Sequence, residues 1–338
     1  MVSVGFLFVF MRKQASNKVD SATANKYDLD ANESFFTMSP ADILPDSFDL
    51  GNAEAYARWR DDKLNGYPLS AEALIVEIAD FQNPSDAELA AMKKQISKTN
   101  MSLYVGGKNS GGDVREVKKM LVDFASRFGL RHLDANLCAD EDAITPLSVA
   151  EGGQRGRYIP YTNKPISWHT DGYYNKPHQQ IGAMILHCIN PAMSGGANAL
   201  MDPEIAYILM REENPDFIHA LTHTDAMLIP ANDEGSGVIR AAQGGPVFSC
   251  PGVPPALHMR YTARTRSIVW RDDGATTAAV AFLTDLLASD SPYIFKHRMA
   301  AGEGVLCNNV LHNRTAFEDD ESRQRLYLRA RYFDRITY

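Results

Sequence analysis

Apolar positions before residue 150 recur at two spacings, one typical of helices and one typical of strands. Ser85 and Glu88 stand at the start of an apolar-periodic run in the pattern of a capping box, which predicts a helix there. A second helix is predicted over 114–128, ended by Gly129, because its apolar residues return every three or four positions. Residues 102–105 predict a short strand. This part of the chain should therefore mix helices and strands.

From about residue 157 onward, short β-type runs separated by glycine- and proline-containing loops dominate the pattern. These runs cover residues 157–161, 181–189, 247–249, 267–270, 304–307 and 326–332. Two helical stretches, 203–213 and 275–288, interrupt them. Many short strands with long insertions predict a mainly β fold with α additions, a double-sheet jelly roll that carries inserted and N-terminal helices.

The sequence shows no internal repeat and no clear boundary between folded domains. Residues 1–34 are mostly polar and lack periodicity, so we expect a flexible N-terminal tail followed by a single domain over 35–338. The apolar stretch at 4–11 is much shorter than the roughly 20 residues that span a bilayer, and it lacks the flanks of a signal peptide. We expect translation to start at Met11 rather than at Met1.

Composition is that of an ordinary globular protein and narrows the choice of partners. Apolar residues make up 45% of the chain and charged residues 22%, so extensive disorder is not expected. The net charge of −8 argues against a nucleic-acid partner. Four scattered cysteines without a CxxC pair predict reduced thiols, no disulfide framework and a cytoplasmic location. We expect no membrane partner, and a homo-oligomer stays open.

Two short motifs far apart in the chain supply metal-ligand chemistry. In Trp168-His-Thr-Asp171, residues His169 and Asp171 would project to the same face of a strand. His312 ends an apolar run near the C-terminus. Two histidines and one carboxylate can form a facial triad, which suits Fe(II) and leaves metal positions open for O2 and a co-substrate. No thiolate accompanies them, which disfavours structural zinc. We therefore predict a catalytic iron site.

The third signal is a period-two alternation over residues 323–332. Its odd positions carry, with one tyrosine, the four arginines Arg323, Arg325, Arg329 and Arg331. An acidic loop at 318–321 separates this segment from His312, so we expect a hairpin that brings arginines beside the metal ligand. A buried arginine there would need an anion such as a carboxylate. The alternative is a solvated strand face whose arginines pair with the acidic loop, and the alternation alone does not decide between the two.

In their order along the chain, four sequence blocks resemble the taurine dioxygenase/TfdA-like family. The blocks are WHTD at 168–171, the run from 181 to 198 that ends in GGAN, LHNRTAF at 311–317 and RQRLYLRARY at 323–332. Together they cover roughly residues 145–335. The resemblance implies a double-stranded β-helix fold, Fe(II) held by the triad, and a dioxygenase that uses 2-oxoglutarate as co-substrate.

The resemblance also implies roles for single residues. Arg325, thirteen residues past His312, matches the arginine that binds the distal carboxylate of 2-oxoglutarate. Arg329 matches the arginine that approaches the substrate sulfonate in taurine-type members. Asn198 falls where the family often has a threonine or serine that touches the co-substrate, although the block here reads GGAN. Two further departures are Asn308 in place of the usual aspartate and Asn313 in place of the usual glycine.

Arg329 leads us to expect hydroxylation of a small anionic substrate, with release of succinate and CO2. Candidate pocket residues are Tyr173, Tyr174 and Trp270, and 173–180 is a candidate lid. These aromatic residues leave open a quaternary ammonium substrate, as in γ-butyrobetaine hydroxylase, whose branch has a similar LHCI run. A non-catalytic jelly-roll binding protein is a third alternative. His187, inside an apolar strand, is expected to be a hydrogen-bonded core residue.

Overall fold

The structure, a computed structural model, describes residues 45–108, 110–135, 138–153, 155–233, 238–264 and 268–338. These residues belong to one unit, Ile43–Tyr338, by the contacts they make. The predicted tail over 1–34 and the two candidate start residues, Met1 and Met11, lie outside the described residues. No helix within the described ranges is long and apolar enough to cross a membrane.

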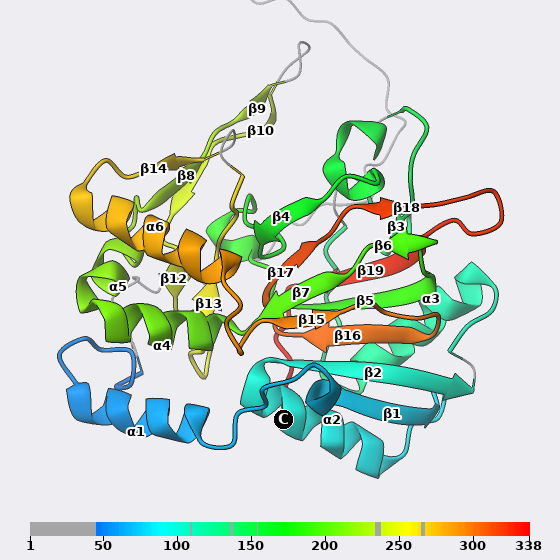
Figure 1. Cartoon of the computed structure of the whole chain (residues 1–338), viewed down its shortest axis with the longest axis horizontal. Coiled ribbons are helices and arrows are strands. Elements are labelled where there is room, and N and C mark those ends of the chain that lie inside the picture. The colour runs from blue at the N-terminus through cyan, green and yellow to red at the C-terminus, as the bar shows by residue number, and fades with distance from the viewer. Residues whose placement is uncertain (1–44, 109, 136–137, 154, 234–237, 265–267) are drawn as a thin grey trace, which may run out of the picture. The chain divides into compact units, whose positions relative to one another are not determined.

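Two β-sheets face each other and form the centre of the molecule (Figure 1). The larger sheet has the strand order β1-β2-β16-β5-β19-β3. Its strands are β1 (Ile75–Asp80), β2 (Met101–Lys108), β3 (Thr145–Leu147), β5 (Ala183–Asn190), β16 (Glu303–Cys307) and β19 (Leu326–Tyr332). The smaller sheet has the order β15-β7-β17-β4. Its strands are β4 (Ile166–His169), β7 (Asn198–Met201), β15 (Phe295–His297) and β17 (Leu311–Arg314). The predicted double-sheet architecture is confirmed.

Two apolar clusters fix the layers. One cluster joins residues of both sheets, such as Leu186 of β5 and Leu311 of β17, and so forms the interior of the sandwich. The other lies between the large sheet and the helices α2 (Asp86–Thr99) and α3 (Val114–Ser126). Strand β19 supplies Tyr327 to the first cluster and Leu328 to the second, so both of its faces are buried. The opposite sheet therefore covers one face of β19, and the helices α2 and α3 lie on the other side of the large sheet.

Helices and small sheets complete the fold. The predicted capping box is present, since Ser85 Oγ accepts from the N–H of Glu88 while the Glu88 carboxylate accepts from the N–H of Ser85. The other helices are α1 (Ala53–Leu64), α4 (Pro203–Glu213), α5 (Pro215–Leu221) and α6 (Gly274–Ala288). The small sheets pair β6 (Ser194–Gly195) with β18 (Phe317–Glu318), β9 (Asn232–Asp233) with β10 (Val238–Arg240), and β12 (Phe248–Ser249) with β13 (His258–Met259). A further small sheet has the order β11 (Gln243–Gly245), β8 (Met227–Ile229), β14 (Val269–Trp270).

Two expectations from the sequence are wrong. Residues 157–161 do not form a strand but two turns of 3₁₀-helix, η3 (Arg155–Arg157) and η4 (Ile159–Tyr161), because Pro160 favours a helical start. The mixture of helices and strands expected before residue 150 is confirmed, and its strands β1 and β2 pair in parallel in the large sheet. The hairpin predicted between His312 and the arginine-rich strand is also absent, because β17 and β19 lie in opposite sheets.

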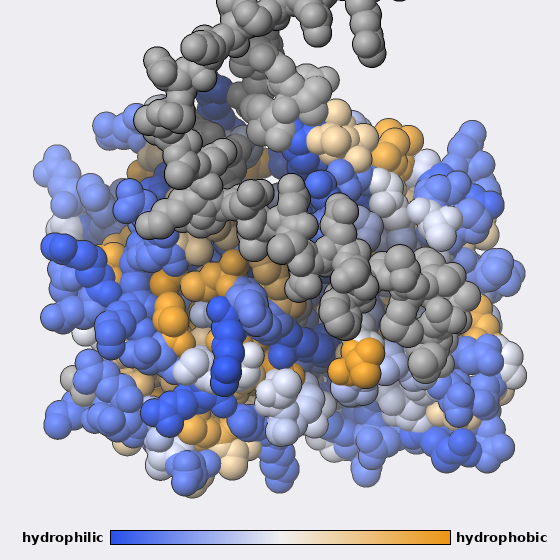
Figure 2. Space-filling view, turned by 180° about the vertical axis from the view of Figure 1, so that it is seen from behind, coloured by the Kyte–Doolittle hydropathy of each residue, from blue (hydrophilic) through white to orange (hydrophobic). Residues whose placement is uncertain are grey.

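Two short 3₁₀ turns, η2 (Glu72–Leu74) and η5 (Pro177–Gln179), lie in the connections. The face seen in Figure 2 is mostly hydrophilic where described residues are visible, with separate hydrophobic patches. Exposed large apolar side chains come from distant parts of the chain, for example Leu69, Val253 and Tyr338. Scattered apolar exposure of this kind is normal for a folded protein and marks no particular interface.

Candidate metal centre

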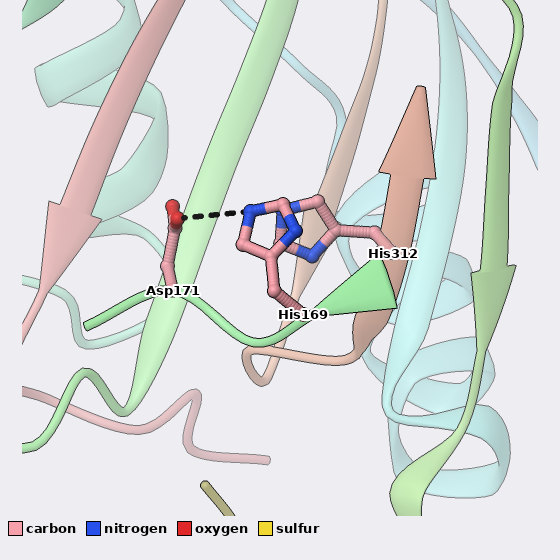
Figure 3. A group of neighbouring side chains, drawn as sticks. All are labelled: His169, Asp171 and His312. Atoms are coloured by element: carbon pink, nitrogen blue, oxygen red, sulfur yellow. Dashed lines mark ion pairs between the residues drawn. The ribbon is translucent and has the colours of Figure 1, made fainter. Parts of the chain in front are cut away.

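Antiparallel pairing of β4 with β17 brings two histidines together from positions far apart in the sequence. His169, the last residue of β4, is the direct partner of His312 in β17, and their ring centroids lie 4.2 Å apart. Asp171 follows two residues later, just beyond the strand, and its Oδ1 lies 3.7 Å from His169 Nε2 (Figure 3). One ligand atom from each of the three residues lies within 4.8 Å of the others. The structure thus assembles the predicted triad.

The hydrogen bonds of the two rings leave the same nitrogen of each free for a metal. His169 Nδ1 lies 2.9 Å from the carbonyl oxygen of Ser167, and His312 Nδ1 lies 2.9 Å from that of Val310. A carbonyl only accepts, so both Nδ1 atoms carry the proton and both Nε2 lone pairs are available. Burial lowers the pKa of His169 to about 3, helped by the neighbouring His312 ring, and burial also lowers the pKa of His312. Both imidazoles are therefore neutral, as metal ligands must be.

The carboxylate of Asp171 is only half used by the protein. Burial alone would raise its pKa, but the positive charges of Arg329 and Arg331 outweigh burial and hold the pKa well below its usual range. Arg329 Nη1 donates to Asp171 Oδ1 at 3.1 Å, while the buried Oδ2 has no hydrogen-bond partner in the described part of the chain. An ionised buried oxygen without a partner is costly unless a cation binds it. Neutral imidazoles with one carboxylate oxygen are a donor set that fits Fe(II).

Arg325, directly before β19, reaches the interior without an ion-pair partner among the described residues. The residue is 2% exposed, and its Nε and Nη1 have no hydrogen-bond partner within the described ranges. Its guanidinium lies over the rings of Tyr327, at 3.8 Å, and Phe317, at 5.1 Å. Burial lowers its pKa, and no carboxylate in the described part of the chain forms an ion pair with it. The solvated alternative therefore does not hold for Arg325, although Arg323 is exposed.

The remaining predicted residues are unevenly placed around the triad. The ring of Tyr173 stands edge-on to His169 at 6.4 Å, and the ring of Tyr174 lies 5.1 Å from that of Tyr173. Asn198 is buried, donates its amide to the carbonyl of Asn313 at 2.9 Å, and leaves its Oδ1 without a partner. Trp270 instead packs its ring 6.3 Å from that of Tyr261, with no triad residue among its ring contacts in the described ranges.

Sequence reasoning missed a buried ion pair beside the site. Arg331 bonds to the carboxylate of Asp134 and donates to Tyr174 Oη at 3.0 Å. The alternation in β19 pointed to Arg331, but no motif marked Asp134. His187 behaves as predicted, since its Nδ1 meets Tyr104 Oη at 3.0 Å and its Nε2 meets a backbone carbonyl at 2.8 Å.

Residues 113–331 match the model of the family described as "Taurine catabolism dioxygenase TauD, TfdA family". The match covers well over half of the chain, so the protein belongs to this family. It is accordingly a 2-oxoglutarate-dependent dioxygenase that uses Fe(II), rather than a non-catalytic jelly-roll binding protein.

Individual relatives share little sequence identity with this chain. A uridine-5'-phosphate dioxygenase from Streptomyces sp is 27% identical over 202 residues, which are 57% of this chain and 71% of the relative. A taurine dioxygenase from Burkholderia xenovorans has a similar structure, with a TM-score of 0.51 and 14% identity over 78% of this chain and 89% of that one. Asparagine oxygenase superposes with a TM-score of 0.52 and 13% identity over 73% and 77% of the two chains. These structures confirm the fold.

Proposed function

We propose that this protein hydroxylates a small anionic organic substrate at an iron held by His169, Asp171 and His312. When bound, Fe(II) and 2-oxoglutarate activate O2, and 2-oxoglutarate is converted to succinate and CO2 as the substrate is oxidised. The observation that carries this proposal is the pairing of an assembled triad with the buried, uncompensated guanidinium of Arg325. A cation and a metal site inside one sandwich suit a dicarboxylate that chelates iron at one end.

The chain's own residues would divide the work as follows. Carbonyls of Ser167 and Val310 orient the two imidazoles, so that their Nε2 atoms face one ion. Arg329 keeps Asp171 ionised and fixes one of its oxygens. Arg325 would bind the distal carboxylate of 2-oxoglutarate. Asn198 would contact the co-substrate through its amide N–H, because a carboxylate only accepts hydrogen bonds. Tyr173 and Tyr174, at the start of the proposed lid 173–180, would shield the site from water.

Charges around Tyr174 favour an anionic substrate over a quaternary ammonium one. The guanidinium groups of Arg240 and Arg331 lie 5.8 Å and 5.9 Å from the centroid of its ring. An aromatic cage for a cation needs a ring face without competing positive charge. The Nε of Arg329 is buried without a partner, so this arginine retains a donor for a substrate anion beside its bond to Asp171. The similar uridine-5'-phosphate dioxygenase has, by its name, an anionic substrate too.

The direct test measures succinate formed from 2-oxoglutarate by the Fe(II)-loaded protein with a panel of sulfonates, carboxylates, phosphate esters and betaines. We expect an anionic compound to stimulate turnover, and Arg329→Ala to weaken its binding by about tenfold or more. Arg323→Ala, at an exposed position three residues before β19, is the control and should change nothing. Stimulation by betaines alone, or substrate affinity unchanged in Arg329→Ala, would show that the anion assignment is wrong.

We also infer that residues 35–338 form a single domain and that the protein works in the cytoplasm. The described residues fall in one contact unit, and none of the four cysteines is paired in a disulfide. Limited proteolysis and cell fractionation test these two inferences. Whether the protein forms a homo-oligomer can be measured by sedimentation.

A further inference from the structure

Asn309 occupies the turn that connects β16 to β17, three residues before the ligand His312. Its backbone lies in the left-handed region, with φ of 50°, which asparagine adopts more readily than most other residues. The side chain is 2% exposed, so it points into the protein rather than into solvent. A buried amide has to find hydrogen-bond partners, and those partners show what the residue does.

The hydrogen-bond partners of this amide lie in the connection from β4 to β5, which carries the carboxylate of Asp171. Asn309 Oδ1 accepts from the backbone N–H of Asp171 at 2.7 Å. Its Nδ2 donates to the backbone carbonyl of Asp171 at 2.9 Å and to that of Ile181 at 2.9 Å. The Asn309 side chain thus binds both the N–H and the carbonyl of Asp171, while the backbone of Asn309 continues to His312, three residues later.

The segment at Asp171 needs such support because it lies outside the sheet. Strand β4 ends at His169, and Gly172 then turns the chain with φ of 67°. The N–H of Thr170 bonds to the carbonyl of Tyr261, but both backbone polar groups of Asp171 bond to the side chain of Asn309. Among the described residues, the carboxylate itself has a hydrogen bond only with Arg329, which leaves its direction to be set largely by the backbone.

We propose that Asn309 is a positioning residue that sets where the Asp171 carboxylate stands relative to the His312 imidazole. The inference rests on the proposed ligand set, and it goes further by naming the residue that holds the two parts of that set in register. Loss of a group that orients a metal ligand typically weakens metal affinity by about 10- to 100-fold. We expect that loss for Asn309, although the residue touches neither metal nor substrate.

Asn308 offers a matched control at the neighbouring position. It is buried to a similar degree, but its amide bonds to Asn100 Oδ1 and Tyr338 Oη, both at 3.1 Å, and its Oδ1 accepts from the N–H of Ile336. None of these groups belongs to the segment around Asp171. Asn308→Ala therefore removes an equally buried amide from the same turn without touching the carboxylate segment.

The experiment is an anaerobic Fe(II) titration of the full chain, with thermal unfolding of the metal-free protein measured in parallel. Asn309→Gly removes the side chain and tolerates the positive φ, and Asn309→Asp keeps an acceptor for the Asp171 N–H as a second variant should the first not fold. We expect either variant to raise the Kd for Fe(II) about 10- to 100-fold, against less than about twofold for Asn308→Ala. The KM for 2-oxoglutarate should follow iron occupancy and be normal in iron-saturated protein.

His312→Ala distinguishes an error in the proposed ligand set from an error in the proposed role of Asn309. If His312→Ala binds Fe(II) as wild type does, the proposed ligand set itself is wrong. If His312→Ala loses iron but the folded Asn309 variants bind it normally, the ligand set stands and the positioning role is refuted. Equal loss of iron affinity in Asn308→Ala and Asn309→Gly would also refute it, because the effect would then come from loosening the turn as a whole.

Discussion

The two ends of strand β19 each bury an arginine, and the protein treats them differently. Arg325 and Arg331 are both 2% exposed. Arg331 forms an ion pair with Asp134 and a hydrogen bond with Tyr174, and these groups, with Asp171, raise its pKa against the effect of burial. Arg325 has aromatic rings around it and no ion-pair partner among the described residues, and burial lowers its pKa. The fold supplies a counter-charge to Arg331, and the described residues supply no ion-pair partner to Arg325.

This difference separates a structural charge from a functional one. Burying an unpaired charge costs several kcal/mol, so a native protein accepts it only where something else supplies the counter-charge. For Arg331 that counter-charge is encoded in the chain. For Arg325 we propose that the counter-charge comes from a carboxylate of 2-oxoglutarate. The missing ion-pair partner of Arg325 would then serve ligand binding. The comparison therefore predicts opposite consequences of mutation at the two ends of one strand.

The largest expected effect is on stability, at the Arg331 end. Asp134→Asn leaves the guanidinium of Arg331 buried without a charged partner, which typically destabilises a protein by about 3–5 kcal/mol. Urea unfolding of the metal-free protein measures this change. Glu54→Gln breaks the exposed pair with Arg58 and serves as a control, because exposed pairs contribute little. Equal unfolding curves for wild type and Asp134→Asn would mean that the Arg331 pair is not structural.

The next largest effect is on ligand binding, at the Arg325 end. Arg325→Gln removes the cation that we propose pairs with the co-substrate, so we expect the Kd for 2-oxoglutarate to rise about 100-fold, or about 2.8 kcal/mol. The same change removes a buried unpaired charge, so unfolding stability without ligand should stay the same or increase. Anaerobic binding to the Fe(II)-loaded protein gives the affinity. A large loss of stability with normal affinity would place Arg325 in the structural class with Arg331.

Several parts of this comparison could be predicted from the sequence. The convergence of His169, Asp171 and His312 was predicted, because two of these residues stand two positions apart and the third follows a distinctive apolar run. The β-type run 326–332 matches β19 in both limits, although the alternation itself begins three residues earlier, at Arg323. The alternation could not say whether the arginines are buried, because a strand covered on both faces has no solvent side.

The features that could not be predicted from the sequence depend on contacts between segments far apart in the chain. Nothing in the loop 318–321 shows that the chain crosses from one sheet to the other, and the predicted hairpin was the simpler connection. Asp134 carries no local motif, and it becomes significant only when Arg331 lies beside it. The three bonds from Asn309 to the segment around Asp171 likewise join residues far apart in the chain. Pairing of this kind follows from topology rather than from spacing.

Ligand-linked stability sharpens the comparison further. Because 2-oxoglutarate binds only the folded state, a concentration about 100 times its Kd should stabilise the Fe(II)-loaded wild type by about 2.7 kcal/mol. Asp134→Asn should show the same increase from a lower starting point, since its ligand site is intact. Arg325→Gln should show almost none at that concentration. Thermal unfolding under anaerobic conditions measures all three proteins, and an increase that is missing in Asp134→Asn would contradict the separation of the two arginines.

The smallest expected effect concerns the hydroxyl that links the structural arginine to the proposed lid. Tyr174→Phe removes the acceptor for Arg331 Nη1, and a hydrogen bond to a charged group contributes about 1.5–3 kcal/mol when it is fully buried. Tyr174 is only half-buried, so water can replace part of the bond, and we expect a loss of about 1 kcal/mol in urea unfolding. The double variant with Asp134→Asn should depart from additivity, because both changes remove partners of the same guanidinium. Strict additivity would show that Tyr174 and Asp134 do not act on Arg331 together, and the lid would then be held by other contacts.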